Sequence, residues 1–172
     1  MTKQVRGDVI KGYVKYIKKR WGQAGVDSFE TYASMDLRDL KDKDWYDSDL
    51  LKKIHFWLAE KGDKYVPLSS SYCVQNLGML SYIVKFLNIK TLLQKVPKSF
   101  EDGFSYGSLT IDIKDKKAIA KFKDVVIDKY TCAAWKGAFE GALLATNTKG
   151  TVKPIQEKDM GDNDCYFLIE WD

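Results

Sequence analysis

The chain has 172 residues, of which 45% are hydrophobic and 30% are charged. These values are typical of one globular domain and exclude a disordered chain. No run of 18 apolar residues occurs, so no membrane-spanning helix is expected. The charged first twenty residues also lack the apolar core of a secretory signal. We therefore expect a single domain over residues 1–172 and a cytoplasmic location.

The basic residues are almost all lysine. Only three of the 28 basic residues are arginine, and the net charge is +4. Proteins that read nucleic acids favour arginine for paired hydrogen bonds to bases and phosphates, whereas here lysine alternates with aspartate along most of the chain. This pattern indicates a solvated surface, and we expect no nucleic-acid partner.

Apolar residues recur at helical spacing over residues 1–100. The first stripe predicts a helix that contains Ile10, Val14, Ile17 and Trp21 and is stopped by Gly22 and Gly25. Three serines at 69–71 are typical of a helix start and precede an apolar stripe that reaches residue 87. A last short helix should end at Pro97. In chain order the expected helices cover residues 10–21, 27–35, 48–61, 69–87 and 91–95.

The spacing of apolar residues changes to period two after Gly107. It predicts strands over 109–113, 118–123, 151–157 and 165–171, with a helix over 129–146 between the second and third. Pro154 cannot donate a ladder hydrogen bond, so its strand should lie at a sheet edge or carry a bulge. The fold class is therefore α+β: a helical part over 1–100, followed by a ββαββ unit with an antiparallel sheet over 107–172.

The last strand is apolar on both faces, since Cys165, Phe167 and Ile169 share one face and Tyr166 and Leu168 lie on the other. Such a strand is usually central in its sheet and covered on each side. The helix over 129–146 should cover one face. The other face should be covered by the N-terminal helices or by a second copy of the chain, so a homodimer is expected.

Small residues are spaced by four along the helix over 129–146, at Ala133, Gly137, Gly141 and Ala145. Each interior glycine destabilises a helix by about 1 kcal/mol relative to alanine, so another group should approach this backbone closely. One interpretation is tight packing on the sheet. The other is a groove for a flat or elongated ligand, or for a partner helix.

Two C-terminal segments, CAAWKGAFEGAL at 132–143 and GDNDCYFLIEW at 161–171, resemble the closing motif of the 4-vinyl-reductase-type domains. They resemble more closely a related family of uncharacterised bacterial and archaeal proteins that is abundant in myxobacteria. The opening segment Val5–Val9 and the pair Trp45-Tyr46 also match that family, so the resemblance covers nearly the whole chain. Haem-NO-binding (H-NOX) domains and TRAPP vesicle-tethering subunits are similar in fold.

The resemblance implies a pocket between the helical part and the sheet, which holds haem in H-NOX domains and acyl or aromatic ligands in relatives. An H-NOX domain needs a proximal histidine on the helix before the sheet, and the sequence at 87–91 is LNIKT. The Tyr-x-Ser-x-Arg element that holds the haem propionates is also missing from 125–130. We therefore expect a haem-free pocket without a cofactor, lined by Tyr72, Cys73, Leu77, Leu80, Val84, Trp135, Gly137 and Gly141.

The three cysteines are odd in number, widely spaced and without a CxxC pair, so neither a disulfide framework nor a zinc ribbon is expected from their spacing. Some 4-vinyl-reductase-type sensor domains bind zinc through one Glu and three Cys. That resemblance implies a candidate metal set of Cys132, Glu157 and Cys165, and the alternative is buried thiols. Cys73 is expected to be a core thiol or, as in some TRAPP subunits, to carry an acyl chain.

Motifs for catalysis are missing from the sequence. It contains no GxSxG, GxxxxGK[ST] or GxGxxG segment, and the single histidine, His55, is expected at the edge of an apolar helix stripe. We expect a non-catalytic protein that binds or senses an apolar or aromatic small molecule and signals by contact with a partner protein or with a second copy. The alternative is a TRAPP-like interaction or scaffolding module that acts as a dimer.

Overall fold

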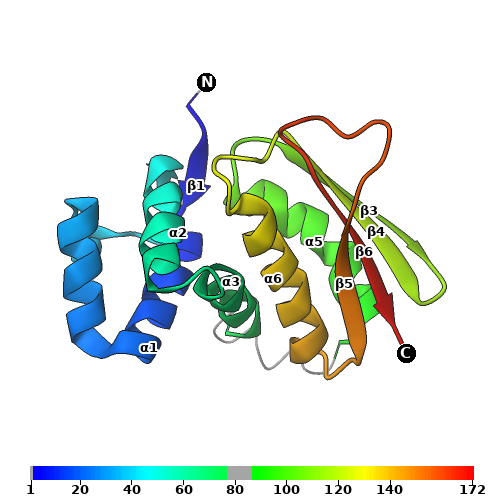
Figure 1. Ribbon diagram of the computed structural model, residues 1–172, viewed down its shortest axis with the longest axis horizontal. Helices are drawn as coiled ribbons and strands as arrows, with labels where there is room; N and C mark the ends of the chain where they lie inside the picture. Colours follow the sequence, from blue (N-terminus) through cyan, green and yellow to red (C-terminus); the bar gives the residue numbers. More distant parts are fainter. Residues whose placement is uncertain (1, 77–86) are drawn as a thin grey trace.

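The computed structural model describes residues 2–76 and 87–172, which form two parts (Figure 1). The first part consists of β1 (Gln4–Arg6), α1 (Gly7–Ala33), β2 (Trp45–Asp47), α2 (Asp49–Lys61) and α3 (Tyr65–Gln75). The second consists of α5 (Ile89–Gly103), β3 (Ser108–Lys114), β4 (Lys117–Lys123), α6 (Thr131–Ala145), β5 (Gly150–Ile155) and β6 (Cys165–Trp171). Among the described residues, no helix is both long and apolar enough to cross a membrane.

The four-stranded sheet is antiparallel throughout, with the strand order β3-β4-β6-β5. The structure is therefore of the α+β class with an antiparallel sheet. β6 is central, as its apolar sequence predicts. β5, which contains Pro154, pairs only with β6 and is an edge strand, as the missing proline N–H requires. α5 and α6 pack on one face of this sheet, and α6 also contacts α3 of the helical part (Figure 1).

Two helix boundaries differ from the prediction. α3 begins at Tyr65, so the serines at 69–71 lie inside the helix, where they are buried and do not cap it. Ser69 and Ser70 instead donate hydrogen bonds to the Val66 carbonyl. α5 continues through Pro97 to Gly103, because its buried face, which includes Leu93 and Phe100, packs on the sheet. Tertiary packing here outweighs the helix-breaking tendency of proline.

Gly22 breaks the first helix, as predicted. Its φ of 69° and ψ of −164° are not helical, and glycine tolerates this conformation because it has no Cβ. The helix resumes directly afterwards and ends at Ala33, so the two expected helices form one kinked α1. The short strands β1 and β2 pair Val5 with Tyr46, which brings together two segments that carried the family resemblance.

The outer face of β6 is covered differently from the prediction. Tyr166 on this face is only 1% exposed, and its cover comes from the same part of the chain. Lys121 Nζ lies 5.1 Å from the Tyr166 ring centre and forms an ion pair with Glu157, while the Tyr166 hydroxyl donates to the Asp159 carbonyl. Tyr166 therefore needs no cover from the N-terminal helices or from a second chain, whereas Leu168 on the same face is only half-buried. The homodimer stays a prediction.

Candidate functional site

The small-residue face of α6 is occupied by α3. A Cβ added at Gly137 would overlap the Pro67 carbonyl, and one added at Gly141 would lie 2.6 Å from the Ser71 carbonyl oxygen. The close approach inferred from the two glycines is therefore present, but the partner is the α3 backbone and not the sheet. The strip is a helix–helix contact that joins the two parts of the molecule, and it is not an open groove.

The residues expected to line a pocket lie in separate layers. Tyr72 and Cys73 face α1: the Tyr16 and Tyr72 ring centres are 5.5 Å apart, and a Cβ added at Gly12 would lie 3.0 Å from Cys73 Sγ. Trp135 stacks on Phe122 at 4.4 Å in the core beneath the sheet. Leu77, Leu80 and Val84 lie outside the described residues. The assignment of all these expected pocket residues to a ligand site stays a prediction.

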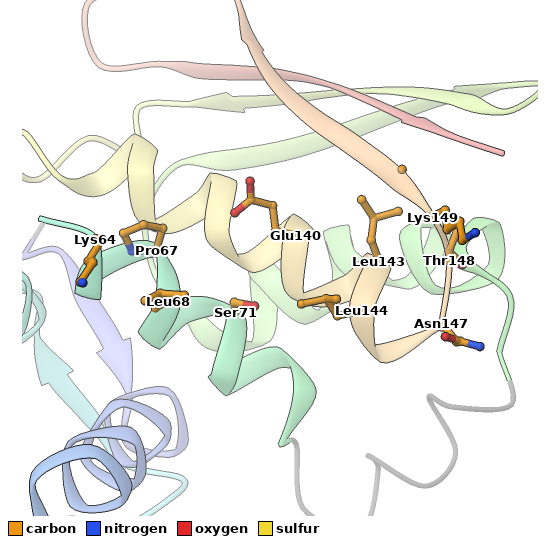
Figure 2. Close-up of a pocket in the computed structure, with 11 residues that line it drawn as sticks. Lys64, Pro67, Leu68, Ser71, Glu140, Leu143, Leu144, Asn147, Thr148 and Lys149 are labelled. Atoms are coloured by element: carbon orange, nitrogen blue, oxygen red, sulfur yellow. The ribbon is translucent and has the colours of Figure 1, made fainter.

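A groove of about 750 Å³ lies beside the α3–α6 contact, between these helices and the start of β5 (Figure 2). Its apolar wall includes Leu68, which is 49% exposed, and Leu144, which is 63% exposed. Pro67 and the buried Leu143 also line it. One feature of the sequence could have indicated this apolar surface. Leu143 and Leu144 are adjacent on a helix, so only one of them can face the sheet and the other must lie elsewhere on the helix.

The charges at the rim of the groove come from Lys64, Glu140 and Lys149. Glu140 forms an ion pair with Lys136, one turn earlier on α6. Lys64 and Lys149 have no acidic group within 4.0 Å among the described residues. Figure 2 shows these two lysines at opposite ends of the groove, with the leucines between them. The groove therefore combines an apolar wall with unneutralised positive charge.

A buried His–Asp pair joins the two parts of the molecule. His55 on α2 is 1% exposed and its Nδ1 lies 3.0 Å from Asp128 Oδ2, in the turn before α6. An ionised carboxylate only accepts hydrogen bonds, so Nδ1–H is the donor. Burial alone would raise the pKa of Asp128, but hydrogen bonds from His55, the Tyr130 amide and Thr131 hold it below its usual value. The expected edge position of His55 is wrong: the residue is buried, and Asp128 is the hydrogen-bond partner of one of its two ring nitrogens.

The His55–Asp128 pair has the orientation of a base held by a carboxylate, but among residues 2–76 and 87–172 no side chain completes a catalytic triad with it. His55 Nε2 is buried and has no hydrogen-bond partner among the described residues. The nearby Ser70 hydroxyl is 2.9 Å from the Tyr13 hydroxyl. The pair connects α2 to the turn before α6.

The cysteines adopt an arrangement that their spacing does not predict. Cys132 in α6 and Cys165 in β6 form a disulfide across 33 residues. Glu157, the third residue of the candidate zinc set, pairs with Lys121, and the described residues hold no cluster of three His, Cys, Asp or Glu side chains that could bind a metal. Cys73 is a free thiol whose pKa is raised to about 12 by burial, which makes it a weak nucleophile for acylation.

Neither a family model nor a curated protein matches the chain. Solved structures do match it. The chain has the H-NOX fold. An oxygen-binding H-NOX domain related to soluble guanylate cyclases aligns with a TM-score of 0.76 over 96% of this chain and 94% of that chain, at 12% identity. An H-NOX structure from work on H-NOX activation aligns with a TM-score of 0.76 over 96% of both chains, at 14% identity. A mutant H-NOX domain of T. tengcongensis gives 0.73 over 96% and 97%, at 16% identity.

The described residues do not fit an H-NOX type of haem site. The helix before the sheet is α5, which contains no histidine, and Asn88 before it accepts a hydrogen bond from the Thr91 amide. The space between α5, α6 and the sheet is filled by stacked rings: Phe100, Phe104 and Phe122 all lie within 5.5 Å of Trp135, between ring centres. A porphyrin would have to displace this cluster. The resemblance of the closing motif to 4-vinyl-reductase-type domains stays a prediction.

Proposed function

We propose that this protein is a haem-free, non-catalytic sensor domain that binds an apolar or aromatic small molecule in the groove between α3 and α6. The observation that carries the proposal is the exposure of Leu68 and Leu144 on the wall of one groove. Apolar side chains that remain exposed in a concave surface are typical of ligand sites. A neighbour in fold is described as an oxygen-binding domain, which supports ligand sensing as the class of function.

The position of the groove supports sensing rather than storage. α3 belongs to the helical part and α6 to the sheet part, and the groove is lined by both. A ligand that contacts both helices favours the arrangement of the two parts in which both sets of contacts are made. Binding can therefore change the surface that a signalling partner meets.

A non-catalytic role is supported by the chemistry of the groove. Among the described residues, its lining contains no histidine or cysteine and one carboxylate, Glu140, which is paired with Lys136. The chain's one imidazole is buried in the contact between α2 and the turn before α6. Acid–base catalysis needs a titratable group within hydrogen-bond reach of the substrate, so binding is the better supported role.

Titration with the neutral fluorophore Nile red tests this proposal. We expect one saturable site with blue-shifted emission. Leu68→Ser and Leu144→Ser should each weaken binding about fivefold, because each removes about 1 kcal/mol of apolar contact. Tyr32→Ser, which removes an exposed aromatic ring on α1 away from the groove, should have no effect. Absent binding, or equal binding by all variants, would refute the proposal.

The same two leucines also support a second function, a TRAPP-like interaction module. A two-fold dimer contact over this face would bury both side chains. Sedimentation at micromolar concentration distinguishes the two. A dimer that Leu144→Glu dissociates would favour the interaction module, whereas a monomer that persists on concentration would leave the sensor.

A further inference from the structure

Lys64, which lines one end of the groove, belongs to a cluster of two cations around the Tyr65 ring, and the other cation, Arg20, lies beside the groove without lining it. Arg20 on α1 donates a hydrogen bond from Nη2 to the Tyr65 hydroxyl at 3.3 Å, and its guanidinium lies 5.5 Å from the Tyr65 ring centre. Lys64 Nζ lies 5.3 Å from the same ring centre. The hydrogen bond from Arg20 lowers the pKa of the Tyr65 hydroxyl, and the charges of Arg20 and Lys64 add to this effect. Two cations from different segments therefore converge on one ring.

Further lysines extend this positive region. Lys61 Nζ lies 4.9 Å from the Trp57 ring centre, and Lys19 Nζ lies 4.9 Å from that of Tyr72. Like Arg20 and Lys64, neither has an acidic group within 4.0 Å among the described residues. Uncompensated cations at one end of a cleft attract an anionic group.

The apolar wall of the groove begins at this cationic end. Lys64, Pro67 and Leu68 line the groove together, and Pro67 contacts α6 at Gly137. Leu144 lies seven residues further along α6, so the apolar wall is about 10 Å long at the helical rise of ~1.5 Å per residue. A chain of eight to ten carbon atoms, about the same length, fits such a wall.

We infer that the ligand of the groove is an amphipathic anion: its carboxylate or phosphate head lies at Arg20 and Lys64 beside Tyr65, and its apolar chain lies along Leu68 and Leu144. This inference rests on the proposed function and adds the ligand's charge and orientation. Arginine and lysine are the side chains that carboxylates and phosphates favour as partners. Between the two leucines lies Ser71, whose hydroxyl already accepts a hydrogen bond from Gln75 Nε2 (Figure 2).

A set of four ligands with one chain and different heads tests the inference by isothermal titration below micelle-forming concentrations. Decanoate and decyl phosphate should each bind at one site about tenfold more tightly than decanol, which corresponds to about 1.4 kcal/mol. Decyltrimethylammonium should bind most weakly. The ratio of the dissociation constants of decanoate and decyl phosphate identifies which head group the site prefers.

Matched variants assign the two ends of the site. Arg20→Gln and Lys64→Gln should each weaken binding of the two anions about fivefold to tenfold and leave decanol unchanged. Leu68→Ser should weaken binding of the anions and of decanol alike. Lys158→Gln removes an exposed lysine outside the groove and should change nothing. Far-UV circular dichroism of each variant checks that the fold is retained.

Three results would overturn the inference. If decanol binds as tightly as the anions and Leu68→Ser weakens its binding, the placement of an anionic head at Arg20 and Lys64 is wrong while the proposed function stands. If the anions depend on Arg20 and Lys64 but not on Leu68, they bind as surface ions without the groove. If no member of the set and no neutral probe binds, both the inference and the proposed function are wrong.

Discussion

Removal of the Asp128 carboxylate should destabilise the protein strongly, because this group connects its two parts. The Asp128 side chain is buried and accepts hydrogen bonds from His55 Nδ1 at 3.0 Å, from the Tyr130 amide at 2.7 Å and from the Thr131 hydroxyl at 3.3 Å. Breaking a buried pair by removing one partner costs about 3–5 kcal/mol, and the Tyr130 amide and the Thr131 hydroxyl also lose their acceptor. We expect Asp128→Ala to lose at least 3 kcal/mol of unfolding free energy.

A milder variant separates charge from hydrogen bonding. The side-chain oxygen of Asp128→Asn can still accept hydrogen bonds from His55 and from the start of α6, so this variant should lose less than half as much stability. Urea unfolding followed by tryptophan fluorescence and circular dichroism measures both variants. A loss below about 1 kcal/mol for Asp128→Ala would show that His55 finds another partner and would refute the reasoning.

Titration of the Asp128 carboxyl should make the free energy of unfolding depend on pH. The pKa of Asp128 is lower in the folded chain than in the unfolded chain, so the unfolded state binds the proton more readily. The stability from this pair is therefore fully present above about pH 4, the unfolded value, and is lost as the pH falls through the folded value. Between pH 6 and strong acid, wild-type protein should lose more stability than Asp128→Asn, and parallel pH curves would contradict this assignment.

Three further predictions concern packing, redox state and haem. Gly141→Leu should lower the free energy of unfolding by at least about 3 kcal/mol, because α3 leaves no room for the side chain; thermal melting with the exposed Leu144→Ala as control measures this. Under oxidising conditions, urea unfolding should show that Cys132→Ser lowers the free energy of unfolding by about 3–4 kcal/mol, the loop entropy of a disulfide that spans 33 residues. Under reducing conditions, where wild type also lacks the disulfide, Cys132→Ser should match wild type. Titration with hemin should give no spectrum of a single axial imidazole, since His55 is held by Asp128; a stoichiometric five-coordinate spectrum that His55→Ala abolishes would contradict this.

Local features of the fold could be predicted from the sequence because they depend on neighbouring residues. The break at Gly22 follows from its own backbone freedom, and the edge position of β5 follows from the missing amide of Pro154. The start of α3 could not be predicted in this way. The serines at 69–71 are good capping residues, but burial against α6 and hydrogen bonds to Val66 place them inside the helix.

Contacts between distant segments account for most of what the sequence did not reveal about the site. His55 and Asp128 are 73 residues apart, and nothing in the local pattern of either segment predicts their pairing. The same holds for the Cys132–Cys165 disulfide, since its cysteines fit no spacing motif. The glycines of α6 did predict a close approach, but spacing alone could not identify α3 as the helix that makes it.

The α3–α6 contact is the structural basis of the proposed haem-free site. Gly137 and Gly141 allow the α3 backbone to lie directly on α6, and the aromatic cluster around Trp135 fills the space beneath the sheet. Side chains and backbone fill both of these places. The groove beside the α3–α6 contact is lined by both parts of the molecule, and there Leu68 and Leu144 remain exposed. A ligand bound there would still contact both parts, and so could bias their arrangement as an interior ligand would.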